Sequence, residues 1–281
     1  MTSSSPSTMC VVEVGGIAVG LRAGNQNFLD SVQRRYMGFL SSSRPEVELE
    51  LELVNYGPVS DDDVRVRREG SGWIFERGDF RAQWDPGSGR GQVRQSANPY
   101  ALDSVLRILH SMILAGRGGF LLHAASATCG PERDEKARAY LFPGVSGAGK
   151  TTLTHVAPPD VIRLSDEVSY VRSVASGYAA FGTPFSGELA QPGANCSAPV
   201  AALFFLEKGS SNRIEEVSPS DAARLLMRNI LFFAEDRELV DQLFDLACDF
   251  VEKVPVRRLT FYPDSRVWEE IRNFEAVAAH V

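Results

Sequence analysis

The segment Leu141–Leu153, LFPGVSGAGKTTL, constrains this chain more than any other, because it fits the spacing G-x-x-x-x-G-K-[ST]. A strand-like AYLF precedes the glycines, and a helix-forming KTTLTHVA follows them until two prolines stop it. Glycines at 144, 147 and 149 leave room for successive backbone N–H groups to turn inward and bind an anion. The segment therefore predicts a phosphate-binding loop; a glycine turn of purely structural use is the alternative.

The residues of this loop have predicted roles in holding a nucleoside triphosphate. Lys150 is expected to reach the β- and γ-phosphates, and Thr151 to give its hydroxyl to Mg²⁺. The following helix would direct the positive end of its dipole at the anion. We therefore expect ATP and Mg²⁺ as cofactors. The predicted nucleotide contacts are Gly144, Val145, Ser146, Gly147, Ala148, Gly149, Lys150, Thr151 and Thr152.

Two adjacent carboxylates come shortly after the loop. VIRLSDEVSYV, residues 161–171, is predicted as one strand that carries Asp166 and Glu167, although Arg163 interrupts its apolar run. Carboxylates behind a P-loop helix suit two tasks, holding Mg²⁺ and taking a proton from an attacking hydroxyl. We predict Asp166 as the general base and Glu167 as a metal ligand. Asp-Glu pairs are also common at the edges of turns.

The pattern of the chain changes near residue 100, which predicts two domains, 1–100 and 101–281. In the first, VVEV and IAVGL form a hairpin around a Gly-Gly pair, a helix covers about 26–40, and residues 47–54 alternate as a strand with one solvated face. This is an N-terminal α+β lobe whose arginines either grip an acidic partner or line solvated hairpin faces. The second domain opens with a helix over 101–115 and contains the P-loop.

Composition excludes several classes of function. The formal net charge of −7 argues against a general affinity for nucleic acid or anionic membranes. No apolar run approaches the roughly 20 residues of a membrane-spanning helix, and the opening residues do not read as an export signal, so we expect a cytoplasmic protein. The four cysteines lie far apart, which is not typical of zinc sites or small disulfide scaffolds.

Three motifs together resemble a known family. LLHAAS, GVSGAGKT and RLSDE are similar, in this order, to the catalytic core of the HPr kinase/phosphorylase-like family, which phosphorylates a serine of the sugar-transport protein HPr. The resemblance covers about residues 119–263. It implies an α/β fold with a mixed-sheet P-loop kinase core like that of phosphoenolpyruvate carboxykinase, and it allows a homo-oligomer. The N-terminal lobe, the glutamate at 167 and the C-terminal segment depart from the family pattern.

Carried across by position, the resemblance implies roles for Asp166, for Glu167 as its acidic neighbour, for His123 and for Glu188. Asp166 would be the general base, and His123 would lie close to the phosphate, unless it is a packed core residue of its apolar strand. Glu188, in GTPFSGEL, would be a later metal ligand, or else it caps or faces solvent. Arg228, in the helix after Ser218-Pro219, could neutralise transition-state charge or be structural. The predicted metal ligands are thus Thr151, Glu167 and Glu188.

The leading hypothesis is an ATP- and Mg²⁺-dependent kinase that transfers the γ-phosphoryl group to a Ser or Thr hydroxyl of a small protein or peptide. The sequence is also compatible with a nucleotide-binding pseudokinase or regulatory module, with a hydrolytic NTPase, and with a small-molecule kinase. Guanine specificity is disfavoured, because no [NT]-K-x-D motif follows the P-loop.

Overall fold

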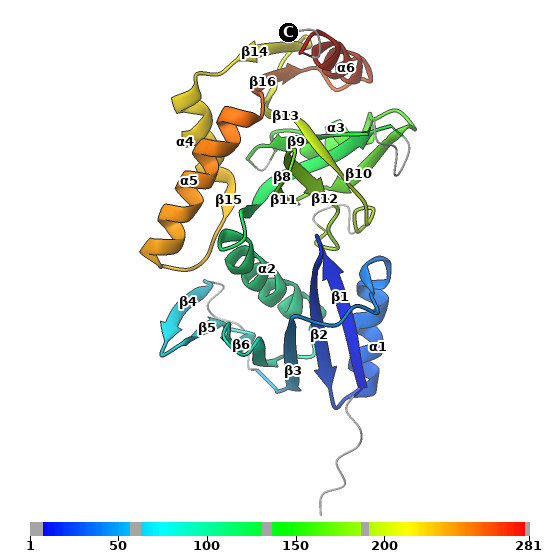
Figure 1. Ribbon diagram of the computed structural model, residues 1–281. Helices are drawn as coiled ribbons and strands as arrows, with labels where there is room; N and C mark the ends of the chain where they lie inside the picture. The colour runs from blue at the N-terminus through cyan, green and yellow to red at the C-terminus, as the bar shows by residue number, and fades with distance from the viewer. Residues whose placement is uncertain (1–7, 57–62, 131–136, 146, 187–190, 279–281) are drawn as a thin grey trace, which may run out of the picture. The chain divides into compact units, whose positions relative to one another are not determined.

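The computed structural model describes residues 8–56, 63–130, 137–145, 147–186 and 191–278 (Figure 1). These residues form an α/β structure with two mixed sheets and six α-helices, all counted over the described ranges. Contacts divide the chain into two compact units. The N-terminal unit comprises Met1–Ile113 and Phe232–Val240. The second unit comprises Leu114–Leu231 and Asp241–Val281, and we call it the P-loop unit after the loop predicted in it. Among the described residues, no helix is both long enough and apolar enough to cross a membrane.

The N-terminal unit is built on a seven-stranded sheet with the order β1-β2-β3-β7-β6-β5-β4. The pairs β2–β3 and β3–β7 are parallel, and the other neighbours are antiparallel. Its elements are β1 (Thr8–Val14), β2 (Ile17–Ala23), α1 (Gln26–Arg35), the 3-10 helix η1 (Met37–Phe39), β3 (Val47–Leu53), β4 (Arg65–Glu69), β5 (Gly72–Arg77), β6 (Phe80–Asp85), β7 (Arg90–Gln95) and α2 (Pro99–Ala115), whose last two residues belong to the other unit.

Local sequence explains several of these elements. The predicted hairpin is confirmed, because Gly15 and Gly16 adopt φ of 58° and 79° and Val14 pairs with Ile17 across the turn. The strand predicted at residues 47–54 is confirmed as β3, with alternate residues buried. The helix predicted over about 26–40 is shorter. Helix α1 begins after Asn25, whose side chain accepts the N–H of Phe28 at 3.0 Å, and it ends at Arg35 before the separate turn of η1.

The P-loop unit contains a nine-stranded mixed sheet in which two long strands, β8 and β13, each pair with more than two neighbours. Its elements are β8 (Gly119–Cys129), β9 (Arg138–Pro143), α3 (Lys150–His155), β10 (Val161–Ser165), β11 (Val168–Val174), β12 (Gly177–Phe181), β13 (Ser197–Lys208), β14 (Arg213–Glu216), α4 (Pro219–Asn229), β15 (Ile230–Leu231), α5 (Arg237–Lys253), which begins in the N-terminal unit, β16 (Val256–Phe261) and α6 (Arg266–Ala278).

The strand pairings of this unit close on themselves. Strand β8 pairs with β11, β11 with β12, β12 with β13, β13 with β9, and β9 again with β8. The core on one side of this sheet is aromatic: Phe142 stacks on Phe204 with ring centroids 6.0 Å apart, and Trp268 of α6 meets Phe142 edge-on at 5.6 Å. This packing anchors β9, the strand that leads into the predicted P-loop, against β13 and α6.

Candidate functional site

The predicted phosphate-binding loop lies between a strand and a helix, as the sequence suggested. Strand β9 ends at Pro143 and α3 begins at Lys150. Gly147 and Gly149 adopt φ of 80° and 109°, a backbone region that favours glycine. The N–H of Ala148 donates to the carbonyl oxygen of Val145 at 3.0 Å, which tightens the turn. Ser146 is outside the described residues.

The loop is held by close packing at both ends. A Cβ atom on Gly149 would come within 2.5 Å of Cζ of Phe261, and one on Gly144 within 2.8 Å of Cβ of Ala148. Leu153 of α3 has a buried side chain. The backbone carbonyl oxygen of Leu153 accepts the indole N–H of Trp268 at 3.2 Å, which holds α3 against α6. The glycines therefore serve the packing of the loop as well as its backbone conformation.

Lys150 folds back over the loop that precedes it. Its Nζ donates to the carbonyl oxygen of Gly144 at 2.5 Å and to that of Val145 at 3.5 Å. Val145 is 74% exposed, so this loop is open to solvent. Of the next two residues, Thr151 is half-buried and Thr152 is exposed. The ammonium group thus lies against the backbone carbonyls at the start of the loop.

The acidic pair lies in a turn and not in a strand. The single strand predicted over residues 161–171 is wrong: β10 ends at Ser165 and β11 begins at Val168. The hydroxyl oxygen of Ser165 accepts the backbone N–H of Glu167 at 3.2 Å and that of Val168 at 2.9 Å, which bends the chain. Asp166 is buried, with 5% of its surface exposed, and Glu167 is half-buried.

Strand β8 joins the acidic turn to the P-loop. Ala124 is paired with Pro143, the residue before the loop, and its N–H donates to the carbonyl oxygen of Glu167 at 3.0 Å. The next residue toward the start of β8 is His123, which is half-buried and lies opposite Val168 in β11. Neighbouring strands are about 4.8 Å apart. His123, the acidic turn and the start of the P-loop therefore converge around one position of β8.

Both edges of β8 change partner at this position. On one edge, β10 pairs with residues 126–129 and β11 with residues 119–123, and the acidic pair fills the interval. On the other edge, β9 pairs with residues 124–129 and β15 with residues 121 and 122. The acidic pair keeps the register of β8 between its two strands, and on the other edge β9 ends where the predicted P-loop begins.

The two remaining predicted residues, Arg228 and Glu188, are less directly connected to this part of β8. Arg228 is exposed in the last turn of α4, and the chain then enters β15, where Ile230 lies opposite Leu122. The backbone two residues after Arg228 is thus one strand away from the residue that precedes His123. Glu188 is outside the described residues. Within the described part of the chain, no group of three or more His, Cys, Asp and Glu residues is arranged to hold a metal ion.

Sequence reasoning missed a segment that packs against the acidic turn. Residues Gly182 and Gly193 lie so close to other backbone that a Cβ atom on either would come within 1.7 Å of a carbonyl oxygen. Between them in sequence lies Thr183, which is completely buried. The dipeptide Pro-Gly at 192–193 signals a turn, but only the tertiary contacts show that its backbone lies against Leu164.

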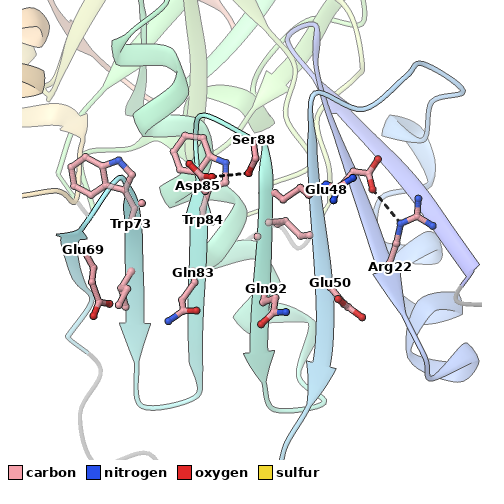
Figure 2. A pocket seen from close by; sticks show the side chains of 15 residues that line it. Arg22, Glu48, Glu50, Glu69, Trp73, Gln83, Trp84, Asp85, Ser88 and Gln92 are labelled. Carbon is pink, nitrogen blue, oxygen red and sulfur yellow. Dashed lines mark hydrogen bonds and ion pairs between the residues drawn. The ribbon is translucent and has the colours of Figure 1, made fainter. Parts of the chain in front are cut away.

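A separate pocket of about 800 Å³ lies on the sheet of the N-terminal unit. Gln83, Gln92 and Glu50 form a row across the neighbouring strands β6, β7 and β3 (Figure 2). At the same pocket, Arg22 donates to Glu48 at 3.3 Å. All the lining residues belong to the N-terminal unit, so this pocket is distinct from the P-loop.

Comparison with known families gives one match. The model of the SynChlorMet cassette protein ScmC matches residues 100–276, which is more than half of the chain. No curated protein matches the chain. The resemblance to the HPr kinase/phosphorylase-like family is therefore wrong, since the family that matches is a different one. The motifs behind that resemblance are short, and phosphate-binding proteins of many families share such motifs.

Proposed function

The chain belongs to the family of the SynChlorMet cassette protein ScmC, and we propose that it is an ATP- and Mg²⁺-dependent phosphotransferase. In this proposal the γ-phosphoryl group passes to the hydroxyl of a Ser or Thr residue in a small protein or peptide. The P-loop unit would then be a mixed-sheet P-loop kinase core of the phosphoenolpyruvate carboxykinase type.

One observation carries the proposal: a single strand position joins the P-loop to the acidic pair. Ala124 lies opposite Pro143, and the backbone N–H of Ala124 donates to the backbone carbonyl oxygen of Glu167 at 3.0 Å. A carboxylate one strand away from a phosphate-binding loop is suited to phosphoryl transfer, which needs a base and a metal ligand beside the γ-phosphate. The glycine conformations of the loop and the ammonium of Lys150 over its carbonyls support nucleotide binding.

The nucleotide would be held by backbone N–H groups of residues 144–151. Lys150 would exchange its carbonyl partners for phosphate oxygens and stabilise the negative charge that develops on them. Mg²⁺, when bound, neutralises charge between the β- and γ-phosphates. Thr151 and Glu167 would supply its protein oxygens; the third predicted ligand, Glu188, is outside the described residues.

The transfer step assigns a proton to Asp166. The acceptor oxygen forms a bond to the γ-phosphorus while the bond from that phosphorus to the β,γ-bridging oxygen breaks, and ADP leaves. The proton of the acceptor hydroxyl passes to the carboxylate of Asp166, which is almost completely buried in a hydrogen-bonded turn. His123 lies in β8 opposite Val168, and Arg228 lies two residues before Ile230, which pairs with Leu122 of β8; both would stabilise charge on the transferred group.

The test is transfer of label from γ-labelled ATP with Mg²⁺ to a panel of Ser- and Thr-containing peptides and small proteins. We expect label on a hydroxyl acceptor, loss of transfer in Lys150→Ala, and loss of transfer with retained ATP binding in Asp166→Asn. Lys208→Ala is the matched control, because Lys208 is exposed at the end of β13. ATP binding without transfer to any acceptor would overturn the proposal in favour of a nucleotide-binding module, and release of inorganic phosphate alone would favour an NTPase.

A further inference from the structure

Thr183 contacts the backbone on both sides of the acidic turn. Its N–H donates to the carbonyl oxygen of Leu164 at 3.0 Å, and its Oγ1 donates to the carbonyl oxygen of Val168 at 2.9 Å. Leu164 is two residues before Asp166, and Val168 is two residues after it. One completely buried residue thus ties together the two ends of the turn that carries the acidic pair, through its backbone N–H at one end and its hydroxyl at the other.

Ser165 holds the same turn from within. Its hydroxyl oxygen accepts the N–H groups of Glu167 and Val168 at 3.2 and 2.9 Å, and only 1% of the residue is exposed. Thr183 and Ser165 therefore satisfy both a carbonyl and an N–H of Val168. In a buried environment, the loss of either partner would leave a backbone group unpaired, which favours rearrangement of the turn.

Backbone hydrogen bonds join Thr183 to Gly193, and Ala194 to β10. The N–H of Gly193 donates to the carbonyl oxygen of Thr183 at 2.9 Å, and that of Ala194 donates to the carbonyl oxygen of Arg163 at 2.9 Å. A Cβ atom on Gly193 would come within 1.7 Å of the carbonyl oxygen of Leu164. The backbone of Gly193 and Ala194 therefore packs against β10 and is hydrogen-bonded to Thr183.

We propose that Thr183 and Ser165 are positioning residues that fix Asp166 and Glu167 relative to the P-loop. This inference rests on the proposed phosphotransfer. A base and a metal ligand act only when they are held within a fraction of an ångström of their working positions. The hydroxyls of Thr183 and Ser165 bond backbone groups of the turn. They would therefore affect the reaction only by fixing the positions of the two carboxylates.

Two pairs of variants separate positioning from general stability. Thr183→Val keeps the shape of the side chain and removes its donor, and Thr183→Ser restores the hydroxyl. Thr128→Val is the matched control, because Thr128 is also buried but its Oγ1 makes only a 3.5 Å contact with the carbonyl of Cys129. Ser165→Ala is paired with Ser126→Ala, since Ser126 is completely buried opposite Ser165 and its hydroxyl has no hydrogen-bond partner among the described residues.

The first readout is kinetic. We expect Thr183→Val and Ser165→Ala to lower kcat for transfer about 10- to 100-fold, with the KM for ATP changed less than about threefold. Thr183→Ser should recover most of the rate, and both controls should behave like the unaltered protein. A wild-type kcat in Thr183→Val, or an equal loss in the two controls, would overturn the inference. If Thr183→Val does not fold, Ser165→Ala against Ser126→Ala carries the same test.

The second readout does not depend on an acceptor. Amide hydrogen exchange of Glu167 and Val168 should be faster in Thr183→Val and Ser165→Ala than in the unaltered protein, and unchanged in the controls. If no transfer is found in the unaltered protein but this exchange pattern appears, the proposed function fails while the positioning of the turn stands. Unchanged exchange in both variants would overturn the positioning itself, whatever the outcome of the transfer assay.

Discussion

The aromatic ring of Phe261 lies against the backbone of Gly149, and a Cβ atom at that position would come within 2.5 Å of its Cζ atom. Gly149 also has φ of 109°, which L side chains rarely adopt. The residue is the N-cap of α3, so the start of the helix and Lys150 depend on it. The P-loop is thus shaped by a residue of β16, which is more than a hundred residues away in sequence.

Gly149→Ala is predicted to damage both stability and nucleotide binding. Gly177→Ala is the matched control, because Gly177 has φ of 120° but open space around its Cβ position. A non-glycine residue in this region costs about 1–2 kcal/mol, so Gly177→Ala should lose about that much in unfolding free energy. Gly149→Ala should lose more and should also weaken ATP binding. Equal losses in urea unfolding would show that the contact with Phe261 imposes no constraint.

Asp103 is predicted to be essential for the stability of the N-terminal unit. It is 4% exposed, accepts Nε of Arg35 at 2.9 Å, and is hydrogen-bonded by the hydroxyl of the completely buried Tyr36. Asp103→Ala leaves a partly buried cation and a buried hydroxyl without their partner, which we expect to cost about 3–5 kcal/mol. Asp30→Ala removes a solvent-accessible carboxylate that accepts Gln26 at 2.7 Å, and should cost less than about 0.5 kcal/mol. Similar urea midpoints for the two variants would contradict this account.

His110 predicts a pH dependence of stability. Burial in α2 lowers the pKa of His110 from 6.5 to about 4. Between these pH values the unfolded chain binds the proton and the folded chain does not. The free energy of unfolding is therefore unaffected by His110 above about pH 6.5, and it falls as the pH drops toward 4. The loss from this residue reaches about 3 kcal/mol. Urea unfolding between pH 7 and pH 4 measures it.

The variant His110→Gln removes this contribution and should show a shallower fall in stability over the same range. His155→Gln is its control, because His155 is exposed in α3. If His110→Gln and the unaltered protein lose stability in parallel as the pH falls, the burial of a neutral imidazole is not the cause.

The parts of the structure that sequence predicted are local. The glycine pair at 15 and 16 sets a hairpin by its own backbone preference, and the alternation of β3 follows from one buried face. The glycine-rich loop between β9 and α3 was predictable for the same reason, because its glycines and Lys150 belong to one short segment, and phosphate binding by this loop stays a prediction. Each of these features depends on residues that are close in sequence.

The parts that sequence did not predict depend on distant contacts. Residues 161–171 have the composition of one strand, and the break appears because the hydroxyl oxygen of Ser165 accepts the N–H groups of Glu167 and Val168. That Ala124 lies between the P-loop strand and the acidic turn follows from the pairing of β8, which no local pattern encodes. Short motifs also failed to identify the family, since the chemistry of phosphate binding allows many families to share them.

The central claim is that the loop from Gly144 to Thr151 binds the phosphates of a nucleotide. Calorimetric titration of the purified protein with ATP, with and without Mg²⁺, tests it most directly, alongside Lys150→Ala and the control Lys208→Ala. We predict saturable binding that Mg²⁺ strengthens, that Lys150→Ala weakens at least about tenfold, or ~1.4 kcal/mol, and that Lys208→Ala leaves unchanged. No binding of ATP by the unaltered protein, or equal affinity in Lys150→Ala, would contradict the account.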